Sequence, residues 1–207
     1  SGQAEQEFDL GWNINAKGSW GLFEAIRNIG DNYCPRVVFT SSIAVFGAPF
    51  PEKITDDFFT TPLTSYGAQK AISELLLSDY SRKGMIDGVS IRLPTICVRP
   101  GKPNLAASGF FSGIIREPLN GKEAILPVST EVRHWHATPR SAAGFLIHAA
   151  EIDTSLLNHR ITLNMPGLSV TVQEQIDALQ RVAGNSVVKL IKHKPDPVIQ
   201  KIVSGWA

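Results

Sequence analysis

The sequence predicts an α/β protein, with part of a doubly wound parallel sheet in its first half and a smaller α+β lobe after it. Two continuous apolar runs, 37–42 and 88–94, are typical of strands buried on both faces. A helical pattern lies between them, and strand, helix and strand in this order form a βαβ unit with a parallel sheet. From about residue 100, glycine and proline interrupt the pattern and shorter elements follow, which indicates the mixed lobe.

Hydrophobic periodicity indicates the two helices of the first half. Residues 3–29 predict one helix. Its buried face would be marked by Phe8, Trp12, Asn15, Ser19, Phe23 and Ile26. A second helix is expected over residues 66–83, between the two strands.

The second half of the chain predicts shorter elements. Pro139 suits the first position of a helix that runs to about Glu151, because proline lacks the N–H that this position leaves unpaired. Three further elements are expected: a strand and turn at 160–167, a helix at 171–184 with Gly184 at its end, and a short strand at 187–193.

The composition favours a soluble protein and argues against several kinds of partner. The 207 residues carry 20 basic and 19 acidic side chains, which leaves no electrostatic footprint for nucleic acid or an anionic membrane. No apolar run reaches the ~18 residues of a membrane span, and the N-terminal stretch does not resemble a signal peptide. Cys34 and Cys97 have no metal or redox spacing and are expected to be small buried residues. We therefore expect a cytoplasmic protein with no nucleic-acid or membrane partner.

A doubly wound nucleotide-binding sheet usually starts with a strand, a glycine-rich turn and a helix that receives the pyrophosphate. No G-x-G-x-x-G occurs in this chain, which begins directly in a helical pattern. We expect residues 1–100 to be such a core without its first βαβ unit. Residues 101–207 would form mainly the substrate-binding lobe, with some segments returning to the core.

Tyr66 and Lys70 are four residues apart and therefore neighbours on one helix face. A phenol is a poor base at neutral pH, but a neighbouring ammonium would lower its pKa and make it a usable acid or base. The pair alone is a weak signal, because the spacing also occurs by chance. Lys70 also has Glu74 four residues on, as in an ordinary surface ion pair.

Hydroxyl groups end the first predicted strand, where an open α/β sheet presents side chains to a ligand. They are Ser41 and Ser42, and a hydroxyl there could bind the same substrate oxygen as Tyr66. The alternative is that both serines only cap the strand end.

Three consecutive motifs carry a resemblance: VVFTSSIAVFG, TPLTSYGAQKAISELLL and VSIRLPTICVRPG. They resemble the signatures of extended short-chain dehydrogenases/reductases, the NAD-dependent epimerase/dehydratase family with a Rossmann-type core. Upstream, NINAKGSWGLFEAIR is similar to the family's N-V-x-G-T-x-N-L-L-E-A-A-R helix. The resemblance spans essentially the whole chain and is strongest over residues 13–101.

The resemblance implies a role for individual residues. Ser42 would be the catalytic hydroxyl and Tyr66 the acid/base, while Lys70 would lower the Tyr66 pKa and hold the nicotinamide ribose. The positions expected near the cofactor or next to the substrate are Pro94, Asn15 and Ser1 for the cofactor and Thr95 for the substrate.

The stretch RHWHATPR departs from the R-D-[YF]-[IV]-H-V-D-D typical of nucleotide-sugar members. It keeps Arg133, replaces the acids and adds Arg140, which suits a small anionic substrate. An Arg can bind a carboxylate through two hydrogen bonds, although both could be ordinary surface or helix-start charges. Together with RLPTICVRPGKPN and ASGFFSGIIREPLNG, the stretch resembles the D-erythronate dehydrogenase branch of the family.

The same stretch contains His134 and His136, which share one side of a strand. A zinc site needs three or four ligands and no third is evident, so we expect no metal. Trp135 and the Phe110–Phe111 pair are expected in the core, with pocket lining as the alternative.

The leading hypothesis is an NAD-dependent oxidoreductase that oxidises a hydroxyl of a small sugar acid, with NADP not excluded as cofactor. The alternatives are a nucleotide-sugar epimerase or dehydratase and, from another class, a non-catalytic NAD-sensing or scaffold protein. The resemblance also implies a homodimer formed through the helices at 3–29 and 66–83.

Overall fold

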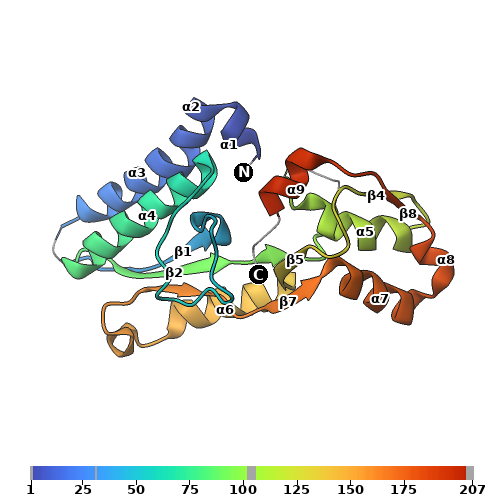
Figure 1. The fold of residues 1–207 in the computed structure, drawn as a ribbon. Helices are drawn as coiled ribbons and strands as arrows, with labels where there is room; N and C mark the ends of the chain where they lie inside the picture. Colours follow the sequence, from blue (N-terminus) through green and yellow to red (C-terminus); the bar gives the residue numbers. More distant parts are fainter. Residues whose placement is uncertain (1, 31, 102–105, 204–207) are drawn as a thin grey trace. The chain divides into compact units, whose positions relative to one another are not determined.

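A computed structural model describes residues 2–30, 32–101 and 106–203 of the chain (Figure 1). The chain divides into two compact units. The first contains Ser1–Leu93 and Arg140–Met165, and the second Pro94–Pro139 and Pro166–Ala207. In the described residues no helix is long and apolar enough to cross a bilayer.

The first unit is built on a three-stranded parallel sheet in the order β1-β2-β6. The strands are β1 (Arg36–Ser42), β2 (Asp87–Leu93) and β6 (Thr162–Asn164). In Figure 1 the helices α3 (Gly18–Arg27) and α4 (Ser65–Arg82) lie on one side of these strands, and α6 (Pro139–Glu151) on the other. This arrangement confirms the α/β class that the sequence predicts.

The central strand is the buried one. β2 has five consecutive buried residues between half-buried ends, whereas most of β1 is half-buried. The sequence predicts burial on both faces for both strands. β1 differs because it lies at the edge of the described sheet.

A small apolar core joins α3 and α4 to the sheet. Phe23 of α3 and Leu77 of α4 are buried in it, as are Ile86 just before β2 and Ile161 just before β6. Aromatic side chains flank the cluster, with the ring of Phe23 5.9 Å from that of Tyr80.

The N-terminal region is not the single helix that the sequence predicts. It is divided into α1 (Gly2–Gln6), α2 (Phe8–Gly11), the π-helical segment η1 (Trp12–Lys17) and α3. Glu7 leaves the helical conformation, and a side chain at Gly11 would lie 2.6 Å from the Ala4 Cβ. The chain therefore turns at Glu7 so that Gly11 packs against Ala4, and the helical path is continuous only from Phe8.

Arg36 holds the amino ends of the first two strands. Its guanidinium donates to Asp87 Oδ2 from Nε (2.9 Å) and from Nη2 (2.7 Å). Its Nη1 donates to the carbonyls of Ala149, Ala150 and Ile152 at the end of α6. The C-terminus of α6 therefore lies at the amino ends of β1 and β2. In Figure 1 the first residues of α6 lie toward the carboxyl ends of these strands, where Ser42 ends β1.

The second unit contains two small sheets, β3-β5-β7 and β4-β8. Its strands are β3 (Thr95–Ile96), β4 (Ala124–Leu126), β5 (Arg133–Ala137), β7 (Leu168–Thr171) and β8 (Ile191–His193). Its helices are α5 (Gly109–Leu119), α7 (Val172–Ala183), α8 (Asn185–Val188) and α9 (Pro197–Val203). The remaining short helices, η2 (Ile43–Val45) and η3 (Thr154–Leu157), belong to the first unit.

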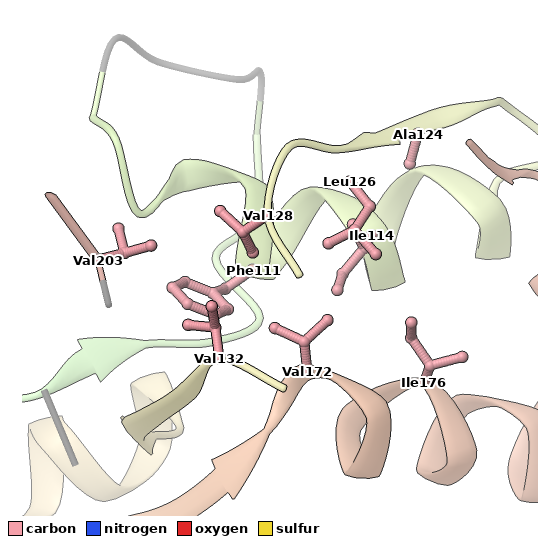
Figure 2. Packing of buried hydrophobic residues seen from close by; sticks show 9 residues of the cluster. All are labelled: Phe111, Ile114, Ala124, Leu126, Val128, Val132, Val172, Ile176 and Val203. Atoms are coloured by element: carbon pink, nitrogen blue, oxygen red, sulfur yellow. The ribbon is translucent and has the colours of Figure 1, made fainter. Parts of the chain in front are cut away.

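Apolar side chains from α5, β4 and α7 form the core of the second unit (Figure 2). Phe111 and Ile114 of α5 and Val128 are fully buried there. Val172 and Ile176 reach the same cluster from α7 (Figure 2). The expected core position of Phe111 is confirmed, while Phe110 is partly buried at the edge of the cluster.

One expected strand and one expected environment differ in the structure. The strand predicted over 187–193 begins with the helical turn α8, and only Ile191–His193 pairs, with β4. The strand and turn predicted over 160–167 correspond to β6, Thr162–Asn164, and the residues after it. Cys34 is exposed and Cys97 half-buried, so the expected burial is wrong for Cys34.

Candidate active site

Ser42 is the last residue of β1, at the carboxyl edge of the parallel sheet. Its Oγ accepts a hydrogen bond of 3.2 Å from Ala44 N and so starts η2. Ser42 therefore does cap the end of its strand, as the alternative interpretation of this serine predicts. The same hydroxyl lies close enough to the Tyr66 phenol to act on its pKa, which strand capping does not require.

Gly67 explains how Tyr66 comes so close to the end of β1. Thr64 begins α4 by accepting from Gly67 N at 3.1 Å, which places Tyr66 in the first turn. A Cβ at Gly67 would lie 2.0 Å from the Ala44 carbonyl oxygen. Only a residue without a side chain lets α4 start against the segment that follows Ser42.

The pKa of the Tyr66 phenol is raised above its ordinary value, because burial disfavours the phenolate. The hydrogen bond with Ser42 acts in the opposite direction and is the smaller effect. The sequence predicts a pKa lowered by Lys70, and the structure corrects this direction. In this geometry Tyr66 is a phenol at neutral pH, able to donate a proton.

Lys70 lies one turn further along α4, with its ammonium at the end of β1. Its Nζ donates to the Thr40 carbonyl at 2.8 Å and lies 4.6 Å from the Phe39 ring centroid and 5.9 Å from that of Tyr66. Burial lowers its pKa, and the Glu74 carboxylate opposes this. An ammonium has three N–H groups, so two remain for a ligand such as a ribose.

Glu74 is not the surface partner of Lys70 that the spacing suggests. It forms a bidentate pair with Arg92 of β2, at 2.9 Å (Nε to Oε1) and 2.8 Å (Nη2 to Oε2). The side chains are 5% and 8% exposed. Sequence reasoning did not find this pair, although Glu74 continues the four-residue spacing of Tyr66 and Lys70.

Asn15 belongs to η1 and faces α4. Its side-chain amide is hydrogen-bonded to that of Gln69 at 2.8 Å, and its carbonyl accepts from Ser73 Oγ at 3.2 Å. It therefore ties η1 to the helix next to Lys70. Ser1, the other cofactor candidate from this region, lies outside the described residues.

The second unit begins with Pro94, which is buried, and Thr95. The Thr95 hydroxyl already has a hydrogen-bond partner within this unit. Its Oγ1 lies 2.7 Å from His134 Nε2. Burial lowers the pKa of His134 to about 3 and that of His136 to about 4, so both imidazoles are neutral at pH 7. They pack against the Phe111 ring. The described residues contain no group of three or more side chains that could hold a metal ion.

The two candidate arginines belong to different units. Arg133, in the second, donates to the Ser169 carbonyl at 3.0 Å and lies 3.4 Å from Glu174 Oε2. Arg140, in the first, is exposed in the opening turn of α6. Because α6 begins at the carboxyl edge of the sheet, Arg140 and Ser42 lie at the same edge of one unit.

These side chains fit one end of a dinucleotide. Lys70 keeps free N–H groups and Tyr66 a hydroxyl, both suited to ribose oxygens, at the sheet edge where α/β proteins bind nucleotides. The glycine-rich turn that receives a pyrophosphate does not occur among the 207 residues. The described residues therefore offer N–H and O–H donors at this end of the sheet.

Comparison with known proteins identifies related chains. The model of the NAD dependent epimerase/dehydratase family matches residues 3–156. D-erythronate dehydrogenases of Cupriavidus necator and Haemophilus influenzae are 50% and 45% identical over 206 residues, all of this chain. The crystal structure of the nucleoside-diphosphate-sugar epimerase from Agrobacterium tumefaciens is 64% identical, with a TM-score of 0.95 over all of this chain.

The chain spans less than two thirds of each of these proteins. It covers 63% and 65% of the two dehydrogenases and 61% of the crystallised chain.

Proposed function

We propose, since this chain belongs to the NAD dependent epimerase/dehydratase family, that the full protein is an NAD-dependent oxidoreductase acting on a hydroxyl of a small sugar acid. The observation that carries the proposal is the set of side chains at the carboxyl edge of the first unit. The Ser42 hydroxyl lies close enough to the Tyr66 phenol to act on its pKa, and Lys70 lies on the next turn of the same helix as Tyr66. A sensor or scaffold would not need this arrangement.

In the proposed reaction Tyr66 moves the proton. Ser42 holds the substrate hydroxyl by a hydrogen bond, and Tyr66, once ionised, takes its proton. The Lys70 ammonium favours the phenolate and binds ribose through its free N–H groups. NAD, when bound, would accept a hydride from the substrate carbon. Pro94 and Asn15 remain proposed cofactor neighbours, with Asn15 acting through its contact with α4.

We propose Arg140 as the main anchor of the substrate carboxylate. It is exposed at the same sheet edge as Ser42, and a guanidinium matches a carboxylate with two hydrogen bonds. Arg133 and Thr95 are proposed as secondary substrate contacts, since each already has a partner within its own unit.

The relatives favour the sugar-acid substrate, because two D-erythronate dehydrogenases match over the whole chain. The Agrobacterium tumefaciens relative favours a second candidate, a nucleotide-sugar epimerase. NAD reduction by the full-length protein should be measured with four- to six-carbon sugar acids and with nucleotide sugars. Turnover of sugar acids is expected. Turnover of nucleotide sugars alone would select the second candidate.

A Tyr66→Phe variant tests the mechanism, because it removes only the phenolic oxygen. We expect it to fold and to lose activity. If every measurable activity stayed unchanged, the Tyr66 mechanism would be wrong and the non-catalytic alternative would replace it.

We also propose that the protein is a cytoplasmic homodimer. The support for a dimer is a group of exposed apolar side chains on η1, α3, the turn after α3, and α4: Ile14, Leu22, Ile29, Ile72 and Leu75. Water-exposed groups of this kind mark interaction surfaces. Sedimentation of the full-length protein should give a dimer, and Leu75→Glu a monomer. A wild-type monomer would overturn this proposal.

A further inference from the structure

The buried pair of Glu74 and Arg92 connects α4 to β2 directly behind the candidate active site. Tyr66, Lys70 and Glu74 occupy three successive turns of one face of α4. The first two reach the end of β1, and the third reaches Arg92 through two hydrogen bonds of 2.9 and 2.8 Å. The ion pair thus holds the helix at the turn that follows Lys70.

Arg92 also contacts the segment that carries Ser42. Its guanidinium lies 4.8 Å from the ring centroid of Phe46, a buried residue four positions after Ser42. In the sheet, Arg92 is paired with Ser41 on β1 and with Asn164 on β6. The Arg92 side chain therefore contacts α4 and the segment after Ser42, and its backbone pairs with β1, the strand that Ser42 ends.

A buried ion pair is an inefficient way to stabilise a fold. Two charges lose their hydration, and replacing such a pair with apolar residues of similar size is often neutral or stabilising. The bidentate geometry instead fixes direction, because two parallel N–H···O bonds allow little rotation or sliding of α4 on β2. The pair supplies orientation that apolar packing would leave loose.

The Glu74 carboxylate also acts on the charge of Lys70. It favours the ammonium and so opposes the effect of burial. The titratable and charged groups around Lys70 are Tyr66 and Glu74 on α4 and, behind Glu74, Arg92 on β2. From β1, Lys70 meets the Thr40 carbonyl and the Phe39 ring.

We infer that Glu74 and Arg92 are positioning residues, which fix the turn of α4 that carries Lys70 and Tyr66 against the end of β1 for proton transfer. This inference rests on the proposed function and names residues that act through Lys70 and Tyr66 without touching the substrate.

The test uses the full-length protein with Glu74→Gln and Arg92→Lys. Glu74→Gln keeps the shape and removes the charge, and we expect kcat to fall about 10- to 100-fold with KM nearly unchanged, since small misplacements of reacting groups cost this much. The loss of kcat at high pH, where the Lys70 ammonium gives up its proton, should begin at lower pH than in the wild type. The reason is that Lys70 loses the carboxylate that favours its ammonium. Arg92→Lys keeps the charge and should retain more activity than Arg92→Met.

A double variant, Glu74→Leu with Arg92→Met, separates positioning from stability. It removes both charges, so the thermal unfolding midpoint should recover relative to either single variant. We expect kcat to stay low. Recovery of kcat together with stability would overturn the inference, and so would a Glu74→Gln enzyme with wild-type kcat and pH profile.

The matched control is Asp87→Asn, which breaks the Arg36–Asp87 pair at the opposite end of β1 and β2. It should lower the unfolding midpoint and leave kcat and the pH profile as in the wild type. An equal loss of kcat in Asp87→Asn would show that any loosening of the sheet has this effect, against the inference. If Tyr66→Phe is inactive while the Glu74 and Arg92 variants are normal, only the positioning role fails; if Tyr66→Phe is active, the proposed function itself fails.

Discussion

An arginine–carboxylate pair lies at each end of the strands β1 and β2, and the two pairs connect different elements of the first unit. At the amino ends Arg36 joins one strand to the other and caps α6, with side chains 23% and 33% exposed for Arg36 and Asp87. At the carboxyl ends Arg92 joins the sheet to α4, with side chains below 10% exposed. The Arg36–Asp87 pair lies at the end of the strands opposite to Ser42. The Arg92–Glu74 pair lies next to β1, which ends at Ser42. The same chemistry therefore serves the fold at one edge and the candidate active site at the other.

At the carboxyl ends of the strands, the largest effect on kcat is expected for Lys70→Met. It keeps the apolar stem and removes the ammonium that the proposed reaction uses to favour the Tyr66 phenolate. We expect kcat to fall about 10²- to 10³-fold, the loss typical of removing one preorganised donor. Steady-state kinetics with NAD and a sugar acid measure it. A change confined to the KM for NAD would show that Lys70 only binds the cofactor.

Gly67→Ala tests the close approach of α4 to the segment after Ser42. The new methyl group would lie 2.0 Å from the Ala44 carbonyl oxygen, so α4 must move away from Ser42. We expect kcat to fall up to about 10²-fold and the unfolding free energy to fall by about 1–3 kcal/mol.

Gly21→Ala is the matched control for this change, because it is also helical and a Cβ there meets nothing within 4 Å. It should leave kcat unchanged and keep or slightly raise stability. If Gly67→Ala behaved in the same way, the tight start of α4 would not matter for the chemistry.

Arg140→Gln tests the proposed carboxylate anchor. Losing a charge-assisted hydrogen bond should raise the KM for the sugar acid about 10-fold and leave the KM for NAD unchanged. Arg133→Gln should have a smaller effect, because Arg133 already donates to Ser169 and faces Glu174. The reverse order would move the anchor to the second unit.

Asp87→Asn should have the smallest effect on activity. It removes a charge that Arg36 and Thr154 bind, so the free energy of unfolding should fall by about 2 kcal/mol. Denaturant unfolding and kcat, measured side by side, check it. A loss of kcat without a loss of stability would contradict the division between the two edges.

The sequence predicts much of the first unit because its signals are local. Buried strands, the helix between them and the hydroxyl at a strand end define where Ser42, Tyr66 and Lys70 come together. The role of Glu74 is missed because its partner, Arg92, is 18 residues away and on another element. A carboxylate four residues after a lysine indicates a surface pair unless the tertiary contact is known.

Long-range packing also explains the other differences. The helix expected over 3–29 is interrupted at Glu7, and Gly11 packs against Ala4 across this break, which periodicity does not reveal. The strand expected over 187–193 begins in a helical turn, because Val188 packs on the core of the second unit before the chain pairs with β4. The direction of the Tyr66 pKa depends on burial, which the spacing of Tyr66 and Lys70 does not contain.

The central claim, that Tyr66 moves the proton, is tested most directly by the pH dependence of kcat for sugar-acid oxidation in the wild type and in Tyr66→Phe. Burial raises the Tyr66 pKa above its ordinary value of 10.0, so the reactive phenolate is a small fraction at neutral pH and grows as pH rises. The wild-type kcat should therefore increase about tenfold per pH unit from neutral into the alkaline range. Tyr66→Phe should be slower by about 10²- to 10⁴-fold and lose this increase. An unchanged rise of kcat with pH in Tyr66→Phe would contradict the claim.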